Sequence, residues 1–218
     1  MTSTLPSLTC PAPASKSITS VCVFCGSGDG GNPEYREQAT ALGKALADNG
    51  YSLVYGGGSV GLMGAVAKAV IDNGGKAKGI VPEPLYRNGS KQICETIIVP
   101  DMHTRKKTMG DHCDAFVVLP GGYGTAEEML EMITWSQLNI HSKPILVLNT
   151  RGFFTPLVEW VNVAVREQFI RPNNANIFVT CNTIDDILQA LKTYQAPSSR
   201  YGLDWVTNSD GQNGRSMT

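Results

Sequence analysis

The sequence predicts an α/β fold: a single doubly wound parallel sheet of about seven strands with helices on both faces, Rossmann-like in type. Short apolar runs alternate along the chain with segments whose apolar residues recur every three or four positions, which is typical of strands alternating with amphipathic helices. The runs are apolar at successive positions, so both faces of each strand are expected to be buried, as in a parallel sheet. Three glycine clusters directly follow three of the runs, where such a sheet binds its ligands.

Seven apolar runs are predicted strands, and the chain contains no internal repeat. The runs are 21–24, 51–55, 78–81, 96–99, 115–119, 145–148 and 176–179. Between them, the spacing of Ala39, Leu42 and Leu46 indicates an amphipathic helix. A second helix is indicated by the spacing of Leu130, Ile133, Gln137 and Leu138. This alternation predicts one layer of parallel strands between two layers of helices.

A single domain is expected for this chain. Its 218 residues can bury a sizeable core without dividing into two domains. Residues 1–18 and 195–218 are polar or rich in Ser, Thr and Pro without periodicity, so both are predicted to be mobile tails, with residues 203–206 docking on the domain. The α/β domain is therefore predicted to span residues 19–194.

Charge and cysteine usage exclude several classes of function. The 18 Lys and Arg residues balance 19 Asp and Glu, so a basic surface for nucleic acid is not expected. The six cysteines are scattered, and Cys22 and Cys25 have CxxC spacing inside an apolar run without a second pair, which favours buried strand cysteines over a disulfide scaffold, a metal site or redox chemistry. The sequence has no run of 18 apolar residues and no signal-peptide pattern, so a cytoplasmic protein without membrane contact is expected.

No metal site is expected from the histidines. His103 and His112 are nine residues apart on one predicted helix, and His141 lies in a turn before Lys143. Surface or capping roles account for all three.

Twelve of the 23 glycines fall into the three clusters. These are Gly26, Gly28, Gly30 and Gly31, then Gly56, Gly57, Gly58, Gly61 and Gly64, and finally Gly121, Gly122 and Gly124. Because the carboxyl ends of parallel strands lie at one edge of a sheet, the clusters are expected to converge on one crevice. The first turn of each following helix offers free N–H groups there, which suits a phosphate-bearing ligand.

The second cluster imitates a dinucleotide-binding fingerprint. Residues 56–61 fit GxGxxG, and Glu83 follows 22 residues after Gly61. The fingerprint belongs after the first strand of a Rossmann unit, however, whereas this one follows the second. A hydride-transfer enzyme is therefore a minor alternative, and close helix–strand packing would explain Gly61 and Gly64 without a ligand.

The third cluster, in residues 120–128, leaves a strongly apolar strand and enters a helix with Thr125 placed as the N-cap. Thr125 and Glu128 have the spacing of a capping box, so one interpretation is that Glu128 only caps the helix. The other is that Glu128 faces the ligand crevice. A carboxylate near a helix N-terminus has its ionised form favoured, which suits a base or a nucleophile.

Arg105 is the second unusual residue. On the helix that follows Asp101, it shares a face with Met102 and Met109, so its guanidinium is predicted on an inward stripe. Snorkelling to the surface is the ordinary alternative. A ligand or carboxylate partner is favoured, because this helix precedes the strand that carries the third glycine cluster.

Taken together, residues 56–64, 102–106 and 120–128 resemble the Lonely Guy (LOG) family of cytokinin riboside 5′-monophosphate phosphoribohydrolases, long mislabelled as lysine decarboxylases. The resemblance extends from about Ser20 to about Tyr194 and rests on a PGGxGTxxE signature with an upstream Arg-Lys pair. The stretch 85–92 and both tails depart from the family pattern.

The resemblance implies water-dependent cleavage of a purine nucleoside 5′-monophosphate, usually N6-prenylated, into free base and ribose 5-phosphate. It implies no cofactor and no metal, and a homodimer or a multiple of dimers with sites near the subunit interface. It also implies that Arg105 and Glu128 are the catalytic pair. The substrate-binding residues that it implies are Gly57, Gly58, Met63, Lys106, Gly121, Gly122, Tyr123, Gly124, Thr125, Glu127 and Thr134.

This assignment fits the chemistry expected of the residues. Cleavage of an N-glycosidic bond passes through an oxocarbenium-like ribosyl cation, which an ionised Glu128 would stabilise. Two alternatives stay open: a broader AMP nucleosidase, and a nucleotide or cofactor carrier on the same fold, which would not need Arg105 and Glu128 together. A lysine decarboxylase is disfavoured, because neither Lys106 nor Lys143 lies in a context typical of a pyridoxal phosphate lysine.

Overall fold

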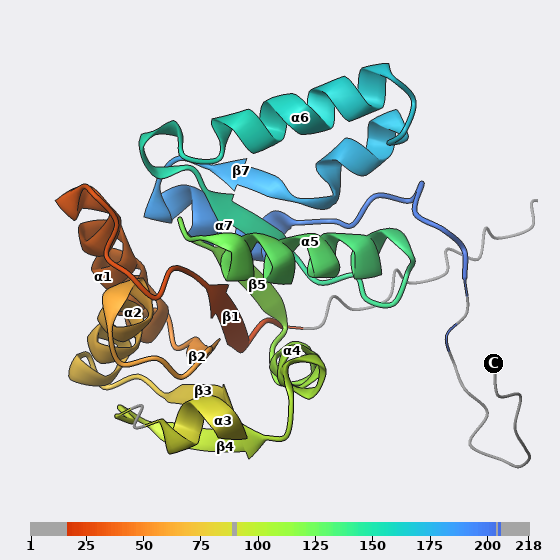
Figure 1. Ribbon diagram of the computed structural model, residues 1–218. Coiled ribbons are helices and arrows are strands. Elements are labelled where there is room, and N and C mark those ends of the chain that lie inside the picture. The colour runs from red at the N-terminus through yellow and green to blue at the C-terminus, as the bar shows by residue number, and fades with distance from the viewer. Residues whose placement is uncertain (1–16, 89–90, 204, 206–218) are drawn as a thin grey trace, which may run out of the picture.

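Seven parallel strands form one sheet in the order β4-β3-β2-β1-β5-β6-β7 (Figure 1). The computed structural model describes residues 17–88, 91–203 and 205. The strands are β1 Ser20–Phe24, β2 Ser52–Tyr55, β3 Ala77–Pro82, β4 Glu95–Val99, β5 Ala115–Val118, β6 Ile145–Leu148 and β7 Val179–Cys181. Every neighbouring pair is parallel, which confirms the predicted fold class.

Helices cover both faces of the sheet. They are α1 Pro33–Asp48, α2 Gly61–Asp72, α3 Glu83–Arg87, α4 Met102–Asp111, α5 Tyr123–Gln137, α6 Thr155–Arg166 and α7 Ile184–Thr193, with 3₁₀ turns η1 Thr150–Gly152 and η2 Pro172–Ile177. Buried residues of α1, α2 and α7 join one apolar core and those of α4, α5 and α6 join the other. Strand β1 supplies both cores, Val21 and Val23 to the first and Cys22 and Phe24 to the second, because side chains alternate along a strand.

The order of the strands places a crevice between β1 and β5. From β1 the chain adds β2, β3 and β4 in one direction and then returns after α4 to pair β5 with the other side of β1. The loops that leave the carboxyl ends of β1 and β5 therefore diverge. Open α/β sheets bind their ligands at such a switch point.

The predicted strands agree with the structure except for the last. Residues 176 and 177 belong to η2, and β7 begins at Val179. Ile177 and Phe178 are buried in the core that also holds α5 and α6, so their apolar character reflects packing rather than a strand. On α5 the buried residues include Met129 and Met132, whereas Leu130 is exposed; the helix was predicted correctly but its inward face was not.

The segment after α7 binds the end of α5. The Arg200 guanidinium donates to the carbonyls of His141 at 2.8 Å and Ser136 at 3.3 Å. The Tyr201 amide donates to Gln137 O, and the indole of Trp205 donates to Leu138 O at 2.7 Å. Gln137 O and Leu138 O, at the end of α5, are carbonyls of the kind that a helix leaves without an intrahelical partner. The Asn139 side-chain amide donates to Leu203 O at 3.1 Å, so both Leu203 and Trp205 contact the domain. Val206 lies outside the described residues, and the domain boundaries stay a prediction.

The cysteines of the CxxC pair are buried. Cys22 and Cys25 are buried free thiols with pKa values raised by desolvation, which agrees with the structural interpretation of the CxxC pair. Among the described residues, no helix has the length and apolarity needed to cross a membrane, and no cluster of three His, Cys, Asp or Glu residues is arranged to hold a metal.

His141 should make stability depend on pH. Its Nε2 lies 3.1 Å from Met132 O, and its Nδ1 accepts from the Lys143 amide. Burial, helped by the charges of Lys143 and Arg200, lowers the pKa of His141 to about 4. The unfolded chain therefore takes up a proton near pH 6.5 that the folded chain refuses until about pH 4. We expect the free energy of unfolding to fall by on the order of 3 kcal/mol across this window.

Urea unfolding of the wild type and His141→Gln between pH 7 and pH 4 measures this contribution. The variant should lose less stability on acidification than the wild type, whereas His112→Gln, a substitution at an exposed histidine, should follow the wild type. Equal pH slopes for wild type and His141→Gln would contradict the assignment.

Candidate active site

The three glycine clusters meet at the carboxyl edge of the sheet. The Gly26 amide donates to Pro120 O at 3.0 Å, which joins the loops after β1 and β5. The amides of Leu62 and Met63 donate to Gly28 O and Gly26 O, which brings the start of α2 to the same place. The predicted convergence on one crevice is therefore confirmed.

Two glycines of the second cluster are explained by packing alone. A Cβ on Gly61 would lie 2.2 Å from Ser27 O, and one on Gly64 would lie 2.3 Å from Ser59 O. Contacts this short to backbone oxygen require glycine. The fingerprint-like spacing of these residues therefore needs no dinucleotide. Glu83, the ribose ligand in that interpretation, forms an ion pair with Arg87 on the short helix α3 instead.

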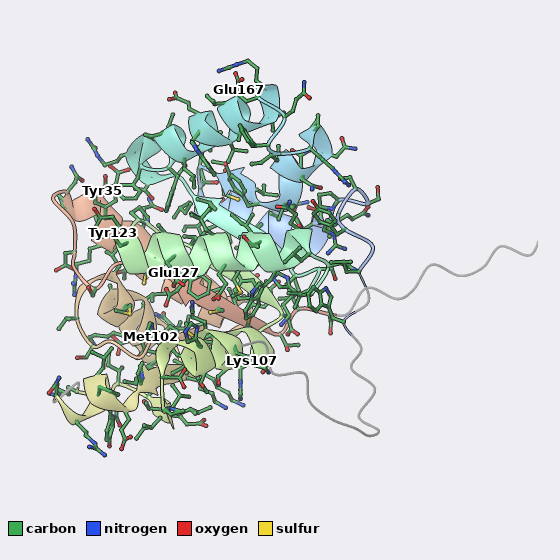
Figure 2. All side chains as sticks on the ribbon, turned by 45° about the vertical axis from the view of Figure 1, so that its right-hand side comes forward. Tyr35, Met102, Lys107, Tyr123, Glu127 and Glu167 are labelled. Carbon is green, nitrogen blue, oxygen red and sulfur yellow. The ribbon has the colours of Figure 1, made fainter. Side chains whose placement is uncertain are left out.

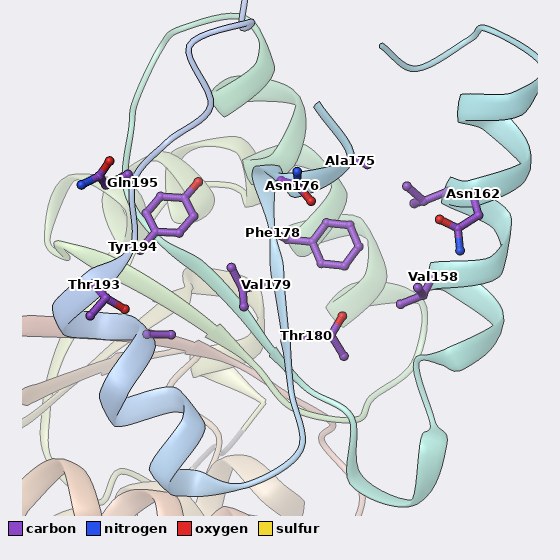
Figure 3. A pocket seen from close by; sticks show the side chains of 12 residues that line it. Val158, Asn162, Ala175, Asn176, Phe178, Val179, Thr180, Thr193, Tyr194 and Gln195 are labelled. Atoms are coloured by element: carbon purple, nitrogen blue, oxygen red, sulfur yellow. The ribbon is translucent and has the colours of Figure 1, made fainter. Parts of the chain in front are cut away.

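A cavity of about 240 Å³ opens at the switch point. It is lined by the loops after β1 and β5 and by three side chains of α1, α2 and the η1 region: Gly26, Ser27, Gly28, Asp29, Gly30, Tyr35, Leu62, Pro120, Gly121, Gly122 and Phe153. A larger cavity of about 550 Å³ lies elsewhere, between α6, β7 and α7 (Figure 3). None of its lining residues belongs to a glycine cluster or to the predicted site. We therefore place the candidate active site at the glycine loops.

Helix α5 begins earlier than the sequence predicted. Its N-cap is Gly122, and Thr125 lies inside the first turn, so the assignment of Thr125 as N-cap is wrong. Thr125 is buried under Gly121, where a Cβ would come within 2.2 Å of its Oγ1. In the part of the chain that the structure describes, no side chain caps this helix end. The first-turn N–H groups and the positive end of the helix dipole thus face the loop, an arrangement that suits an anion.

Glu128 does not complete a capping box but pairs with Arg105. The Arg105 Nη1 donates to Glu128 Oε1 at 2.9 Å, and both residues are more than nine-tenths buried. The same guanidinium donates through Nε to Ile80 O and through Nη2 to Gly56 O. Because three acceptors satisfy it, Arg105 does not snorkel, and the predicted carboxylate partner is confirmed.

One neighbour of Arg105 differs from the prediction. Met109 is buried with it, but Met102 at the start of α4 is exposed (Figure 2). The inward stripe of α4 therefore starts at Arg105, one turn later than the spacing suggested.

Burial sets the basicity of Glu128. Desolvation raises its pKa above the ordinary value, the charge of Arg105 lowers it, and the neighbouring Glu127 and Glu131 raise it. The helix N-terminus therefore does not favour the ionised form as strongly as the sequence suggested, since Glu128 lies in the second turn and has lost most of its water. A carboxylate stripped of water is a stronger base and a closer partner for positive charge.

Lys106 lies next to this pair and is buried as well. Its ammonium donates to Glu127 and lies 3.0 Å from Glu131 Oε2. Burial alone would lower its pKa, but the two carboxylates outweigh that effect and raise it. Lys106 therefore stays protonated and covered by glutamates rather than open to substrate. Sequence reasoning did not single out Glu131, although its position four residues after Glu127 places both on one helix face.

The other predicted residues divide into two groups. Gly57 has φ of +76°, and Gly58 and Met63 lie beside Gly56, the carbonyl partner of Arg105. Gly121, Gly122 and Gly124 form the turn into α5, and Tyr123 is 98% exposed at its tip. With one exception, the predicted substrate-binding residues thus lie in the loops after β2 and β5 and in the first two turns of α2, α4 and α5.

Thr134 is the exception. It lies eleven residues beyond Tyr123 on α5, about 16 Å along the helix, and its hydroxyl donates to Leu130 O. It lines an apolar groove of about 280 Å³ between α5 and α6, not the glycine crevice of its own chain. The structure therefore does not bring Thr134 together with the other predicted residues.

Comparison with known proteins decides the family. A family model described as "Possible lysine decarboxylase" matches residues 63–191. The probable cytokinin riboside 5′-monophosphate phosphoribohydrolase LOGL3 of Oryza sativa subsp. japonica is 44% identical over 190 residues, which cover 85% of this chain and 90% of that protein. The cytokinin riboside 5′-monophosphate phosphoribohydrolase LOG3 of Arabidopsis thaliana is 45% identical over 176 residues, 80% of this chain and 82% of that protein.

This chain belongs to the LOG family. Among solved structures, the Moco carrier protein from Chlamydomonas reinhardtii superposes with a TM-score of 0.62 at 20% identity, covering 79% of this chain and 94% of that one. The molybdenum cofactor binding protein from Rippkaea orientalis gives a TM-score of 0.60 at 18% identity, over 82% and 98%. At these identities the likeness shows that the LOG fold is shared, and nothing more.

The description as a lysine decarboxylase does not fit the residues of this LOG chain. Pyridoxal phosphate would need a lysine whose amine loses its proton readily to form a Schiff base. Lys106 is instead held as an ammonium by two carboxylates, and Lys143 donates to the Gly110 carbonyl beside His141, at the opposite end of β5 and β6 from the glycine loops. Neither lysine offers that chemistry.

Proposed function

We propose that this LOG protein hydrolyses the N-glycosidic bond of cytokinin riboside 5′-monophosphates, which are N6-substituted derivatives of AMP, to free cytokinin base and ribose 5-phosphate. It is an enzyme, an N-glycosyl hydrolase. The observation that carries the proposal is the buried Arg105–Glu128 pair, held beside an uncapped helix N-terminus in a chain 43–46% identical to the curated phosphoribohydrolases.

The phosphate is the remote anchor of the substrate. We assign it to the turn Gly121–Thr125, where first-turn N–H groups and the helix dipole attract an anion. Contacts made far from the reacting bond hold that bond in place against the catalytic groups. A nucleoside without the phosphate should therefore be a poor substrate.

Glu128 is assigned to the reacting carbon. As the bond from C1′ to the base nitrogen breaks, the electron pair leaves with the base and positive charge develops on the ribosyl ring. The carboxylate stabilises that charge and accepts a proton from the water whose oxygen bonds to C1′. That proton then passes to the departing base nitrogen, which returns Glu128 to its ionised form. Arg105 keeps the carboxylate oriented through the 2.9 Å contact, and these steps require no metal or redox cofactor.

The test is release of base from three substrates: N6-isopentenyl-AMP, its riboside, and AMP. The proposal expects release from the first and little from the riboside. No release from either monophosphate would refute it. Equal turnover of N6-isopentenyl-AMP and AMP would favour the broader AMP nucleosidase, and tight binding of both without turnover would favour a carrier.

A homodimer is part of the proposal. The groove between α5 and α6 is rimmed by large exposed apolar side chains, chiefly Trp160 and Phe169. Exposed apolar surface of this kind is typical of an interface. We infer that a second copy covers the groove, which would bring Thr134 close to an interface.

Trp160→Glu tests the dimer. A buried aromatic anchor at an interface contributes about 2 kcal/mol or more, so we expect the dissociation constant of the dimer to rise by about 30-fold or more. Sedimentation velocity across a dilution series measures it. Leu85→Glu, the same kind of change at an exposed leucine on α3, should leave the mass unchanged. A Trp160→Glu protein that sediments like the wild type at every concentration would contradict this interface.

We place the protein in the cytoplasm. The five described cysteines are all free, as is usual in a reducing compartment, and its proposed substrate carries a phosphate.

A further inference from the structure

Lys106 and two glutamates form a second link between α4 and α5. Arg105 and Glu128 make one ion pair, and an adjacent residue on each helix makes another, Lys106 with Glu127. Glu131, one turn further along α5, places Oε2 3.0 Å from the same ammonium. Lys106 therefore has two carboxylate partners, while its side chain is only 6% exposed.

The two carboxylates differ in their access to solvent. The side chain of Glu127 is 54% exposed, and it lies on the flank of α5 that faces α4 (Figure 2). The side chain of Glu131 is 24% exposed, and its Oε2 is buried, with the Lys106 ammonium as its ion-pair partner. Glu127 is thus the more accessible of the two carboxylates, and Glu131 is the more buried.

A buried ammonium needs at least one anionic partner at all times. If Glu127 were its only partner, any substrate group that drew Glu127 away would leave Lys106 buried and unpaired. With Glu131 in place, Glu127 can turn outward without that penalty. Two like charges four residues apart on a helix repel each other, and the shared ammonium removes that repulsion as well.

We propose that Glu131 is a positioning residue of the reaction: it holds Lys106, so that Glu127 is free to leave the ammonium and accept a hydrogen bond from a ribose hydroxyl. This inference rests on the proposed function, since it assigns a ribosyl substrate to the site. Glu131 itself touches neither substrate nor the reacting atoms.

The charge balance around Glu128 supports this role. The groups facing its carboxyl are Arg105 and Lys106 from α4, Glu127 and Glu131 from α5, and the thiols of Cys22 in β1 and Cys25 just after it. Three carboxylates oppose two cations, so the cluster carries one excess negative charge. That excess negative charge stabilises a ribosyl cation. Removing the charge of Glu131 would abolish the excess.

Glu131→Gln tests the inference, because it removes the charge and keeps the size of the side chain. Glu127 should then be bound to Lys106 permanently, and the KM for N6-isopentenyl-AMP should rise on the order of tenfold. The acid limb of kcat/KM should move to lower pH, since a negative charge facing Glu128 is gone. Glu37→Gln, the same change on the exposed face of α1, should alter neither quantity.

A double-mutant cycle shows whether Glu131 acts through Lys106. The KM of Glu131→Gln with Lys106→Met should be no higher than that of Lys106→Met alone. Additive effects of the two substitutions on KM would overturn the inference. It would also be overturned if Glu131→Gln lost activity only in proportion to a lower melting temperature, with an unchanged pH profile, because that result indicates a purely structural role.

A measurement without turnover separates this inference from the proposed function. ¹⁵N NMR titration of the Lys106 ammonium should give a lower pKa in Glu131→Gln than in the wild type, because one of the two carboxylates that raise the pKa of Lys106 has lost its charge. If the wild type releases no base, the proposed function fails. The titration still shows whether Glu131 pairs with Lys106. An unchanged Lys106 titration would overturn the inference.

Discussion

Replacing Glu128 by glutamine is expected to lower kcat for release of base from N6-isopentenyl-AMP by about 10³-fold, with KM changed little. The introduced amide keeps the shape of the side chain, and its oxygen still accepts from Arg105 Nη1. It cannot carry the negative charge that opposes the ribosyl cation, nor accept the proton of the attacking water. Because the charge is needed only as the bond breaks, the loss falls on kcat.

Steady-state kinetics with a stability control measures this effect. The Glu37→Gln variant should retain wild-type activity, since that carboxylate lies on the exposed face of α1. If Glu128→Gln is unstable because Arg105 is poorly paired, the double variant Arg105→Met with Glu128→Leu removes both buried charges and should fold but remain inactive. A Glu128→Gln protein within tenfold of wild-type kcat would contradict the assignment of Glu128.

Replacing Gly121 by alanine is the second change with a large expected effect. The new Cβ would lie 2.2 Å from Thr125 Oγ1 and 2.8 Å from the Gly26 amide nitrogen, so two loops and the start of α5 would have to move apart. Overpacking of this kind costs about 1–3 kcal/mol of stability. A displaced phosphate turn should also lower kcat/KM for the monophosphate by about 10²-fold.

Gly122→Ala is the matched comparison for stability. Gly122 has φ of −96° and open space where its Cβ would stand, so alanine there should leave the melting temperature unchanged. Calorimetric melting of the two variants therefore isolates the steric effect. If Gly121→Ala melts at the same temperature as Gly122→Ala, the close approach of the loops is not what the distances indicate.

Most of the sheet could be predicted from the sequence because its strands are short runs of consecutive apolar residues, and burial on both faces produces that pattern directly. The exception, β7, shows the limit of the argument. Ile177 and Phe178 are as apolar as a strand, but they enter the core from a 3₁₀ turn. An apolar run indicates that its residues are buried. Whether they form a strand or a 3₁₀ turn depends on the backbone segments that lie beside them.

The candidate active site also has features that the sequence predicts and features that it does not. The Arg105 partner was predictable, since a guanidinium on an inward face needs an anion. The start of α5 could not be predicted, because Thr125 and Glu128 have the spacing of a capping box in the sequence. In the structure Thr125 packs beneath Gly121, and Glu128 pairs with Arg105. Glu131 escaped notice because its importance depends on Lys106, which approaches from a different helix.

The three acceptors of Arg105 belong to the loop after β2, to β3 and to α5. One side chain therefore fixes the reacting carboxylate and the mutual placement of three segments. Substitution of Arg105 would disturb the packing of these segments and the reacting carboxylate at the same time. Stability and activity therefore cannot change independently at this position. Divergence of substrate preference among descendants of this chain is accordingly expected at exposed positions such as Tyr123 and Thr134, whose side chains hold no other segment in place among the residues that the structure describes.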